Sequence, residues 1–194
     1  MKNRSMDTPS NRHCFVHRID ADGRISYVSA EWLAFAARND YQTSAEAELG
    51  RPLLSVIADA ETRHLYALLI QRARASKRTV QFGYRCDSPD QRRWMRMHMR
   101  HLAETDEIEF SSRLLRAQTR PRVLLLEPEH GQSHSQRVLS MCSWCKAVLA
   151  EHAWVEVEQA VLRLGLFAME AMPRISHGIC PACSQRLSSP ETLS

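Results

Sequence analysis

The sequence has little of what marks most enzymes and membrane proteins. It holds only six glycines in 194 residues, which leaves little material for a glycine-rich loop that cradles phosphate. No apolar run approaches the roughly 20 residues that span a bilayer. The first residues, MKNRSMDTPSNRH, lack the apolar centre of a secretory signal. No serine–histidine–aspartate order and no paired carboxylates stand out. We therefore expect a cytoplasmic protein that is not an enzyme and does not bind membranes.

Cysteine is scarce except near the end of the chain, where two C-x2-C pairs stand 34 residues apart. Each pair can form a tight turn that points two thiolates at one position, so two pairs supply four sulfur ligands for tetrahedral zinc. In a reducing compartment such pairs are more often metal ligands than disulfides. An all-cysteine shell leaves no open coordination position, which favours a structural zinc over a catalytic one. The predicted ligands are Cys142, Cys145, Cys180 and Cys183.

The role of His177, three residues before Cys180, stays open. It could donate an N–H to a thiolate from outside the ligand set, which is the interpretation we favour, or it could replace one cysteine as a ligand. The two remaining cysteines, Cys14 and Cys86, stand alone in the sequence. We expect both to pack as small core or near-core residues, because free cysteine behaves as a small hydrophobe.

The chemistry of the paired thiols has an alternative as well. A C-x2-C thiol can have a lowered pKa, and zinc release on oxidation would make a switch. A thiol-redox or metal sensor whose zinc centre is the input is therefore the main alternative to structural zinc, and metal-free thiols are a further one.

Charge is spread unevenly along the chain. Residues 1–120 carry 20 Lys and Arg against 15 Asp and Glu, whereas residues 121–194 carry 6 against 7. Nucleic-acid-binding fingers need cationic surface, because phosphate contacts dominate their affinity. The cysteine-containing part is a poor match to that requirement. We do not expect nucleic acid as a partner, and a DNA-binding regulator is the least favoured function.

The first part of the chain shows strand and helix patterns in turn. Residues 15–19 and 24–28 flank an Asp-Gly turn, which is a strong hairpin signal. Period-two alternation predicts further antiparallel strands with one face on a core. These strands are expected at 79–85, at 94–100 with Met95, Met97 and Met99 on one face, and at 108–114.

Two helices are predicted between these strands. Residues 31–38 have helical spacing, and residues 59–74 form the longer candidate, which Asp59 can cap. The expected buried stripe of the longer helix consists of Leu65, Leu68 and Leu69. On the penultimate strand, Arg92, Arg96 and Arg100 could serve a partner surface, but a solvated sheet face is the simpler interpretation.

With this order of elements, residues 13–117 resemble a PAS domain. The resemblance lies in CFVHRIDADGRISYVSAEWLAFA, GRPLLSVIADAETRHLYALL, and VQFGYRCDSPDQRRWMRMHMR with EIEFSSRLL. It implies an α+β fold with a five-stranded antiparallel sheet, helices across one face, and often a small-molecule pocket. It also implies signalling to a protein partner, and it leaves open a homodimer through the sheet or flanking segments.

The sequence does not name a ligand for this PAS-like part. The Asn-Cys-Arg-Phe motif of flavin photosensors is absent from residues 50–57. His64 could be compared with a haem ligand, but it falls in a polar first turn of its helix, and we expect it to be solvated. His98 and the methionines beside it point to opposite faces of their strand, so they cannot converge on copper.

The second part of the chain divides into a linker and a small module. Residues 118–137 are polar and rich in helix and strand breakers, and are predicted as the linker. Residues 138–187 form the module, with a short strand at 146–149 and a helical pattern at 154–164 that Gly165 can end.

This module resembles a small C-terminal domain of bacterial PAS proteins and response regulators. The family signature is CxxCK, a Trp before an acidic amphipathic helix, and SHGICPxC; this chain has MCSWCK, AWVEVEQAVLRL and ISHGICPAC. The resemblance implies a signalling accessory and no reaction. Together the two parts predict a bacterial sensory or regulatory protein that acts through protein contacts.

Overall fold

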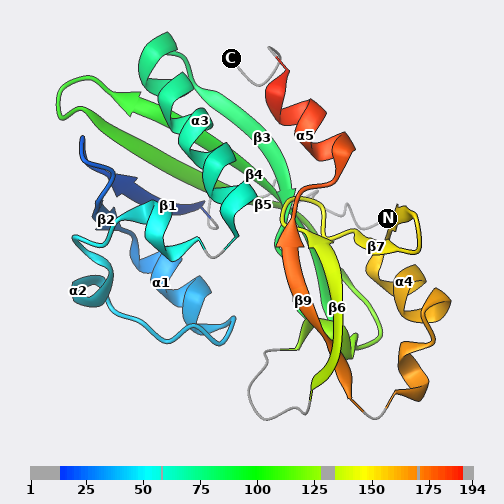
Figure 1. Ribbon diagram of the computed structural model, residues 1–194. Helices are drawn as coiled ribbons and strands as arrows, with labels where there is room; N and C mark the ends of the chain where they lie inside the picture. Colours follow the sequence, from blue (N-terminus) through cyan, green and yellow to red (C-terminus); the bar gives the residue numbers. More distant parts are fainter. Residues whose placement is uncertain (1–13, 58, 128–133, 170, 190–194) are drawn as a thin grey trace, which may run out of the picture.

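The computed structural model describes residues 14–57, 59–127, 134–169 and 171–189. Its elements build two sheets, and the chain passes from the first to the second near residue 120 (Figure 1). The first sheet is antiparallel and has the strand order β2-β1-β5-β4-β3. Its strands are β1 (Cys14–Ile19), β2 (Ile25–Val28), β3 (Val80–Arg85), β4 (Gln91–Leu102) and β5 (Glu107–Thr119).

Helices lie over one face of this sheet, as Figure 1 shows. The expectation of a five-stranded antiparallel sheet with helices on one side is therefore confirmed. The helices are α1 (Ala30–Ala37), α2 (Ala45–Glu48), the 3-10 helix η1 (Leu53–Val56) and the long α3 (Ala60–Ser76).

The local sequence accounts for where these elements begin and end. The Asp20 carboxylate accepts hydrogen bonds from the backbone N–H groups of Asp22 and Arg24, and Gly23 adopts a φ of +77° in the same turn, which closes the hairpin. Asp59 caps α3 as predicted, its carboxylate accepting from the Thr62 N–H at 2.6 Å.

The buried face of α3 differs from the predicted leucine stripe. Leu69 is buried and Leu65 packs against the core, but Leu68 is 46% exposed. The buried positions are instead Thr62, Leu69 and Ala73. They are spaced by seven and then four residues, so they share one stripe of the helix. Leu68 lies about 100° around the helix from Leu69, so it falls outside this stripe.

The alternating strands bury the side chains that their pattern predicts. Met95, Met97 and Met99 are each at most 5% exposed, and Ile108 and Phe110 of the neighbouring strand β5 are fully buried. His98 lies on the other face of β4 and pairs with Gln81 and Ser111, so the methionines and this histidine do not converge.

The second sheet has the order β8-β7-β6-β9. Its strands are β6 (His134–Cys142), β7 (Val148–Ala150), β8 (Ala153–Val155) and β9 (Met172–Gly178). β6 and β9 are parallel neighbours, whereas the other pairs are antiparallel. The helical elements attached to this sheet are η2 (Leu124–Leu126), α4 (Val157–Arg163), η3 (Leu166–Ala168) and α5 (Pro181–Ser188).

Several predicted boundaries in this part shift. The segment 118–137 holds the end of β5, η2 and the first residues of β6, while residues 128–133 lie outside the described ranges. The strand expected at 146–149 begins later, because Lys146 has a φ of +62° and still belongs to the turn after the first cysteine pair. The predicted helix at 154–164 begins only at Val157, since β8 precedes it, and it ends before Gly165 as expected.

One hydrophobic core joins the two sheets. Trp144, which stands between the first two paired cysteines, is 4% exposed and packs with Tyr66 of α3 and Phe82 of β3 at ring-centroid distances of 5.6 and 5.8 Å. Leu187 of α5 belongs to the same cluster. A second core lies between β6, β7, η2, η3 and α4, with Met141, Val148, Val157, Ala160 and Leu166 at its centre. The cysteine-containing sheet therefore shares part of the core of the five-stranded sheet.

Among the described residues, every helix is too short or too polar to cross a membrane.

Candidate metal centre

The parallel pairing of β6 and β9 brings the two cysteine pairs together. Cys142 is the last residue of β6 and stands opposite Gly178, the last residue of β9. Parallel strands end at the same edge of a sheet, so the segments that follow them start side by side. The Ser143 N–H donates to the Gly178 carbonyl at 2.8 Å and fixes this arrangement.

The first cysteine pair lies in a tight turn. The Cys142 N–H donates to the Ala147 carbonyl at 2.8 Å, and the Lys146 N–H donates to the Cys142 carbonyl at 3.0 Å. Lys146 adopts a left-handed backbone conformation, which closes the turn so that the thiols of Cys142 and Cys145 face the same point.

The second cysteine pair lies at the start of a helix. Cys180 occupies the N-cap position of α5, and Pro181 takes the first helical position, where a missing N–H costs nothing. The Cys183 N–H donates to the Cys180 carbonyl at 3.0 Å. One helical turn separates the two cysteines, so their thiols project from the same side.

The four thiols are placed as a metal site requires. Their sulfur atoms all lie within 4.8 Å of one another, and Cys145 Sγ is 3.7 Å from Cys180 Sγ. Four thiolates at the ~2.3 Å zinc–sulfur distance in a tetrahedron stand about 3.8 Å apart. Three of the four, Cys142, Cys180 and Cys183, are buried, and Cys145 is half-buried. The group fits a tetrahedral ion after small shifts of the side chains.

Two hydrogen-bond donors outside the four thiols point at sulfur atoms of the cluster. The Cys180 N–H donates to Cys142 Sγ at 3.4 Å, and the Arg186 guanidinium donates to Cys183 Sγ at 2.9 Å. Hydrogen bonds from Cys145 and Cys183 lower the pKa of Cys142, and the same bond to Cys142 raises the pKa of Cys145 to about 11. Arg186, which the sequence analysis above did not name, offsets part of the charge of a four-thiolate centre; its place three residues after Cys183 on a helix is the signal for it.

The other candidate residues lie away from this cluster or at its border. His177 is an exposed residue of β9, opposite Met141 in register, and the four mutually close ligand groups in the described ranges do not include it. Cys14 is half-buried with its sulfur 2.9 Å from Ser111 Oγ, and burial raises the pKa of the half-buried Cys86. His64 is exposed on α3, in agreement with the solvated position expected for it.

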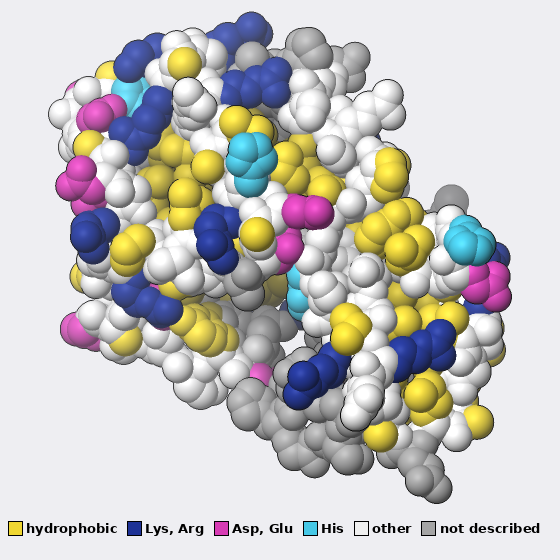
Figure 2. All heavy atoms as spheres, in the orientation of Figure 1, with side chains coloured by type: hydrophobic (Ala, Val, Ile, Leu, Met, Phe, Trp, Pro, Cys, Tyr) yellow, Lys and Arg dark blue, Asp and Glu magenta, His cyan; other side chains and the backbone are white. Residues whose placement is uncertain are grey.

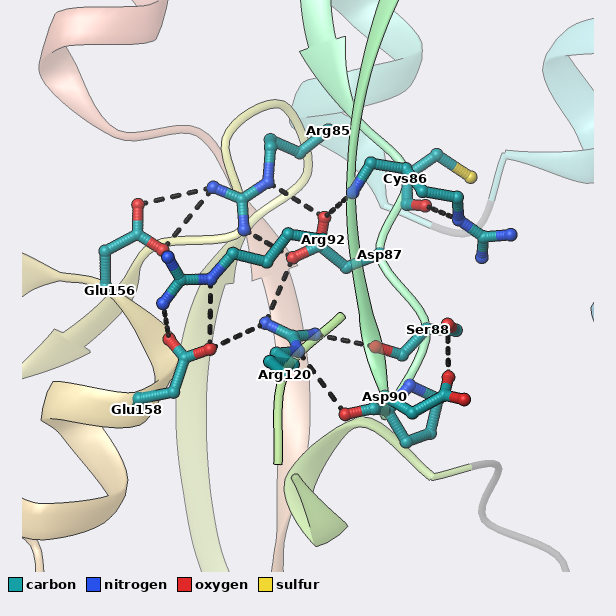
Figure 3. Close-up of polar contacts among 11 residues, drawn as sticks. Arg85, Cys86, Asp87, Ser88, Asp90, Arg92, Arg120, Glu156 and Glu158 are labelled. Atoms are coloured by element: carbon teal, nitrogen blue, oxygen red, sulfur yellow. Dashed lines mark hydrogen bonds and ion pairs between the residues drawn. The ribbon is translucent and has the colours of Figure 1, made fainter. Parts of the chain in front are cut away.

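A network of ion pairs holds the second sheet against the first beside this centre (Figure 3). The Asp87 side chain is fully buried and accepts hydrogen bonds from the Arg85 guanidinium, while Arg120 lies 3.3 Å away on its other side. Both arginines also reach the start of α4: Arg85 lies 3.3 Å from Glu156, and Arg120 lies 3.0 Å from Glu158.

Arg92 completes the network with a 2.7 Å contact to Glu158. Its guanidinium is therefore paired and half-buried, which corrects the expectation of a solvated arginine at this position. Although burial acts in the opposite direction, hydrogen bonds from Arg92 and Arg120 lower the pKa of Glu158. The sequence pattern showed the acidic start of this helix but not the buried arginines that face it.

Direct contacts of backbone and side chains also join the cysteine segments to the first sheet and to α3. The turn that holds Cys142 and Cys145 is called the cysteine turn below. The Arg85 N–H at the end of β3 donates to the Trp144 carbonyl at 2.7 Å. Thr62 Oγ1 on α3 lies 2.9 Å from Ser143 Oγ, and the Ile179 N–H donates to the Glu61 carboxylate at 3.3 Å. Both cysteine-bearing segments thus contact α3 or β3.

Comparison with known proteins gives little beyond this geometry. No protein-family model matches the chain, and no curated protein matches it. A solved structure, the PAS domain of an HTR-like protein from Haloarcula marismortui, is similar with 20% identity and a TM-score of 0.35, over 54% of this chain and 84% of that one. A likeness of this extent assigns neither a family nor a function.

Proposed function

We propose that the protein is a bacterial sensory or regulatory protein of the cytoplasm, in which a PAS module signals through protein contacts and a structural zinc holds the second module in place. The ligands of the zinc would be Cys142, Cys145, Cys180 and Cys183. The observation that carries the proposal is the position of the four thiols: they belong to the core that the two sheets share.

The proposed role of the zinc follows from what its ligands connect. Cys142 ends β6, Cys180 follows β9, and Cys183 belongs to α5, so an ion bound here would tie three elements together at one point. Trp144, between the first two ligands, inserts into the core under α3. A metal that fixes this turn would also fix the position of Trp144. Binding free energy at a structural site becomes folding free energy, and here it would stabilise the contact between the modules.

The expected metal content is one zinc ion per chain. Mass spectrometry under native conditions should find a mass increase of one zinc in the wild type, and no increase after Cys142 and Cys180 are both replaced by serine. The matched control replaces Cys14 and Cys86, which lie outside the cluster, and should keep the zinc. A wild-type protein that is folded without any metal would refute the site.

The second candidate function is a redox or metal sensor, and the exposure of Cys145 is the observation that favours it. Cys145 is the one cluster thiol that is half-buried rather than buried, so an oxidant would reach the centre there first. Oxidation follows thiolate character and access. This alternative predicts zinc release at mild peroxide doses, measured with a chromogenic zinc chelator. If zinc content is unchanged at doses that oxidise free thiols, the centre is structural only.

A further inference from the structure

Two like charges face each other directly on the outward face of the first sheet. Arg96 of β4 pairs with Arg113 of β5 in the strand register, and both side chains are exposed. Directly opposed like charges destabilise an antiparallel pair. This pair therefore lowers the stability of the sheet, and the fold does not require arginine at both positions.

No acidic side chain in the part of the chain that the structure describes pairs with these two arginines. Within the described ranges, neither Arg96 nor Arg113 has a hydrogen bond or an ion pair to another side chain. The far end of the same face is different: Glu109 binds both Arg18 and Arg100 at 2.9 Å. The excess of positive charge is therefore confined to the middle of the sheet.

A third arginine extends the charged region. Arg116 of β5 places its guanidinium 4.9 Å from the ring centroid of Trp94, to which Arg85 also approaches at 5.0 Å. Such contacts orient an arginine without neutralising it. Burial, and then the charges of Arg113 and Arg96, lower the pKa of the neighbouring His98. The surface formed by Arg96, Arg113 and Arg116 is called the arginine face below.

The helix-covered side of the molecule has a different character. There hydrophobic side chains lie between basic and acidic ones over most of the view, and several Lys and Arg side chains gather along its upper edge (Figure 2). The formal net charge of only +4 does not by itself require two arginines to stand directly opposite each other.

We propose that the arginine face binds an acidic segment of a partner protein, whose carboxylates lie between Arg96 and Arg113. Guanidinium groups bind carboxylates in a two-pronged geometry that gives direction as well as strength. This assignment names the class of partner for the proposed signalling function and rests on that function.

Two other occupants fit the face less well. Single-stranded nucleic acid needs aromatic rings on which bases can stack, but the ring of Trp94 is already approached by two guanidiniums. A second copy of the chain, placed sheet to sheet by a two-fold axis, would bring arginine faces together and add like-charge repulsion. The charge pattern therefore disfavours the homodimer through this face that the family resemblance leaves open.

The test uses the full-length, zinc-loaded protein and a fluorescein-labelled peptide of ten glutamates, with binding followed by fluorescence anisotropy at low salt. We expect the double variant R96Q/R113Q to bind at least tenfold more weakly than the wild type. The matched control R38Q/R78Q removes the same charge from two exposed positions elsewhere and should bind within twofold of the wild type. Equal weakening by both variants, or no binding by the wild type, would overturn the proposal.

Two further measurements separate the alternatives. A ten-nucleotide oligothymidine should bind more weakly than the peptide; tighter binding that R96Q/R113Q abolishes would overturn the choice of a protein partner. Because R96Q/R113Q removes the repulsion between the two arginines, the Tm of this double variant should be no lower than that of the wild type, so that lost binding cannot be ascribed to unfolding. Zinc content by native mass spectrometry reports on the proposed metal site independently: a protein that keeps its zinc but ignores the peptide refutes the arginine face alone.

Discussion

Replacing both Cys142 and Cys180 by serine is expected to remove the metal and to destabilise the whole protein, the five-stranded sheet included. Structural zinc contributes ~10–16 kcal/mol of apparent binding free energy in small zinc-finger peptides, which equals or exceeds the ~5–15 kcal/mol by which domains are stable. Here the metal would also hold Trp144 in the core under α3. We therefore expect a loss of at least about 5 kcal/mol in the free energy of unfolding.

Thermal unfolding followed by far-ultraviolet circular dichroism would measure this loss. The signal also reports on the five-stranded sheet, because its strands lie outside the segments that hold the four cysteines. The C14S/C86S control should melt close to the wild type, since neither residue belongs to the cluster. A variant in which only the second sheet is lost, with the first sheet melting at its wild-type temperature, would show that the shared core does not couple the modules.

Replacing Asp87 by alanine is expected to destabilise the protein by about 3–5 kcal/mol, because it leaves buried positive charge without its partner. The Asp87 side chain is fully buried, and the side chains of Arg85 and Arg120 beside it are 7% and 4% exposed. Its carboxylate also accepts from the Arg93 N–H at 3.1 Å. The two glutamates at the start of α4 are the remaining partners and cannot replace it, since both are partly open to solvent.

Urea unfolding of the zinc-loaded protein would measure the effect, with Asp90→Ala as the control. Asp90 belongs to the same turn but is exposed, and its carboxylate accepts a hydrogen bond from Ser88 Oγ, so its loss should cost less than about 1 kcal/mol. Equal effects of the two substitutions would indicate that the buried network does not stabilise the interface. Replacing Asp87 by asparagine, which keeps an acceptor but loses the charge, should give an intermediate result.

Local patterns in the sequence were sufficient to predict the strands of the first sheet and the four cysteines that form the cluster. The alternation of apolar and polar residues over β3, β4 and β5 indicated which face of these strands is buried. The Asp-Gly turn indicated the position of the first hairpin. The spacing of the cysteines restricted which four thiols could meet. Each alternating strand, the Asp-Gly turn and each single cysteine pair is encoded within a few neighbouring residues. The structure bears out where these elements lie in the chain.

The parts that could not be predicted depend on residues far apart in the chain. β6 and β9 have no clear alternation, and β9 contains Pro173, so each is recognisable as a strand only when the other lies beside it. The burial of Arg85 depends on Glu156, 71 residues away. The packing of Trp144 depends on Tyr66 and Phe82. No window of local sequence contains both members of these pairs.

The hydrogen bond between the Arg85 N–H and the Trp144 carbonyl has a consequence for association as well as for stability. β3 is an edge strand of the five-stranded sheet, and unpaired edge strands are templates for strands of other molecules. The cysteine turn occupies one end of this edge, and α5 lies alongside it (Figure 1). A folded cysteine module thus acts as a cap on the sheet, and a chain that fails to close its four thiols would leave an edge at which copies could aggregate.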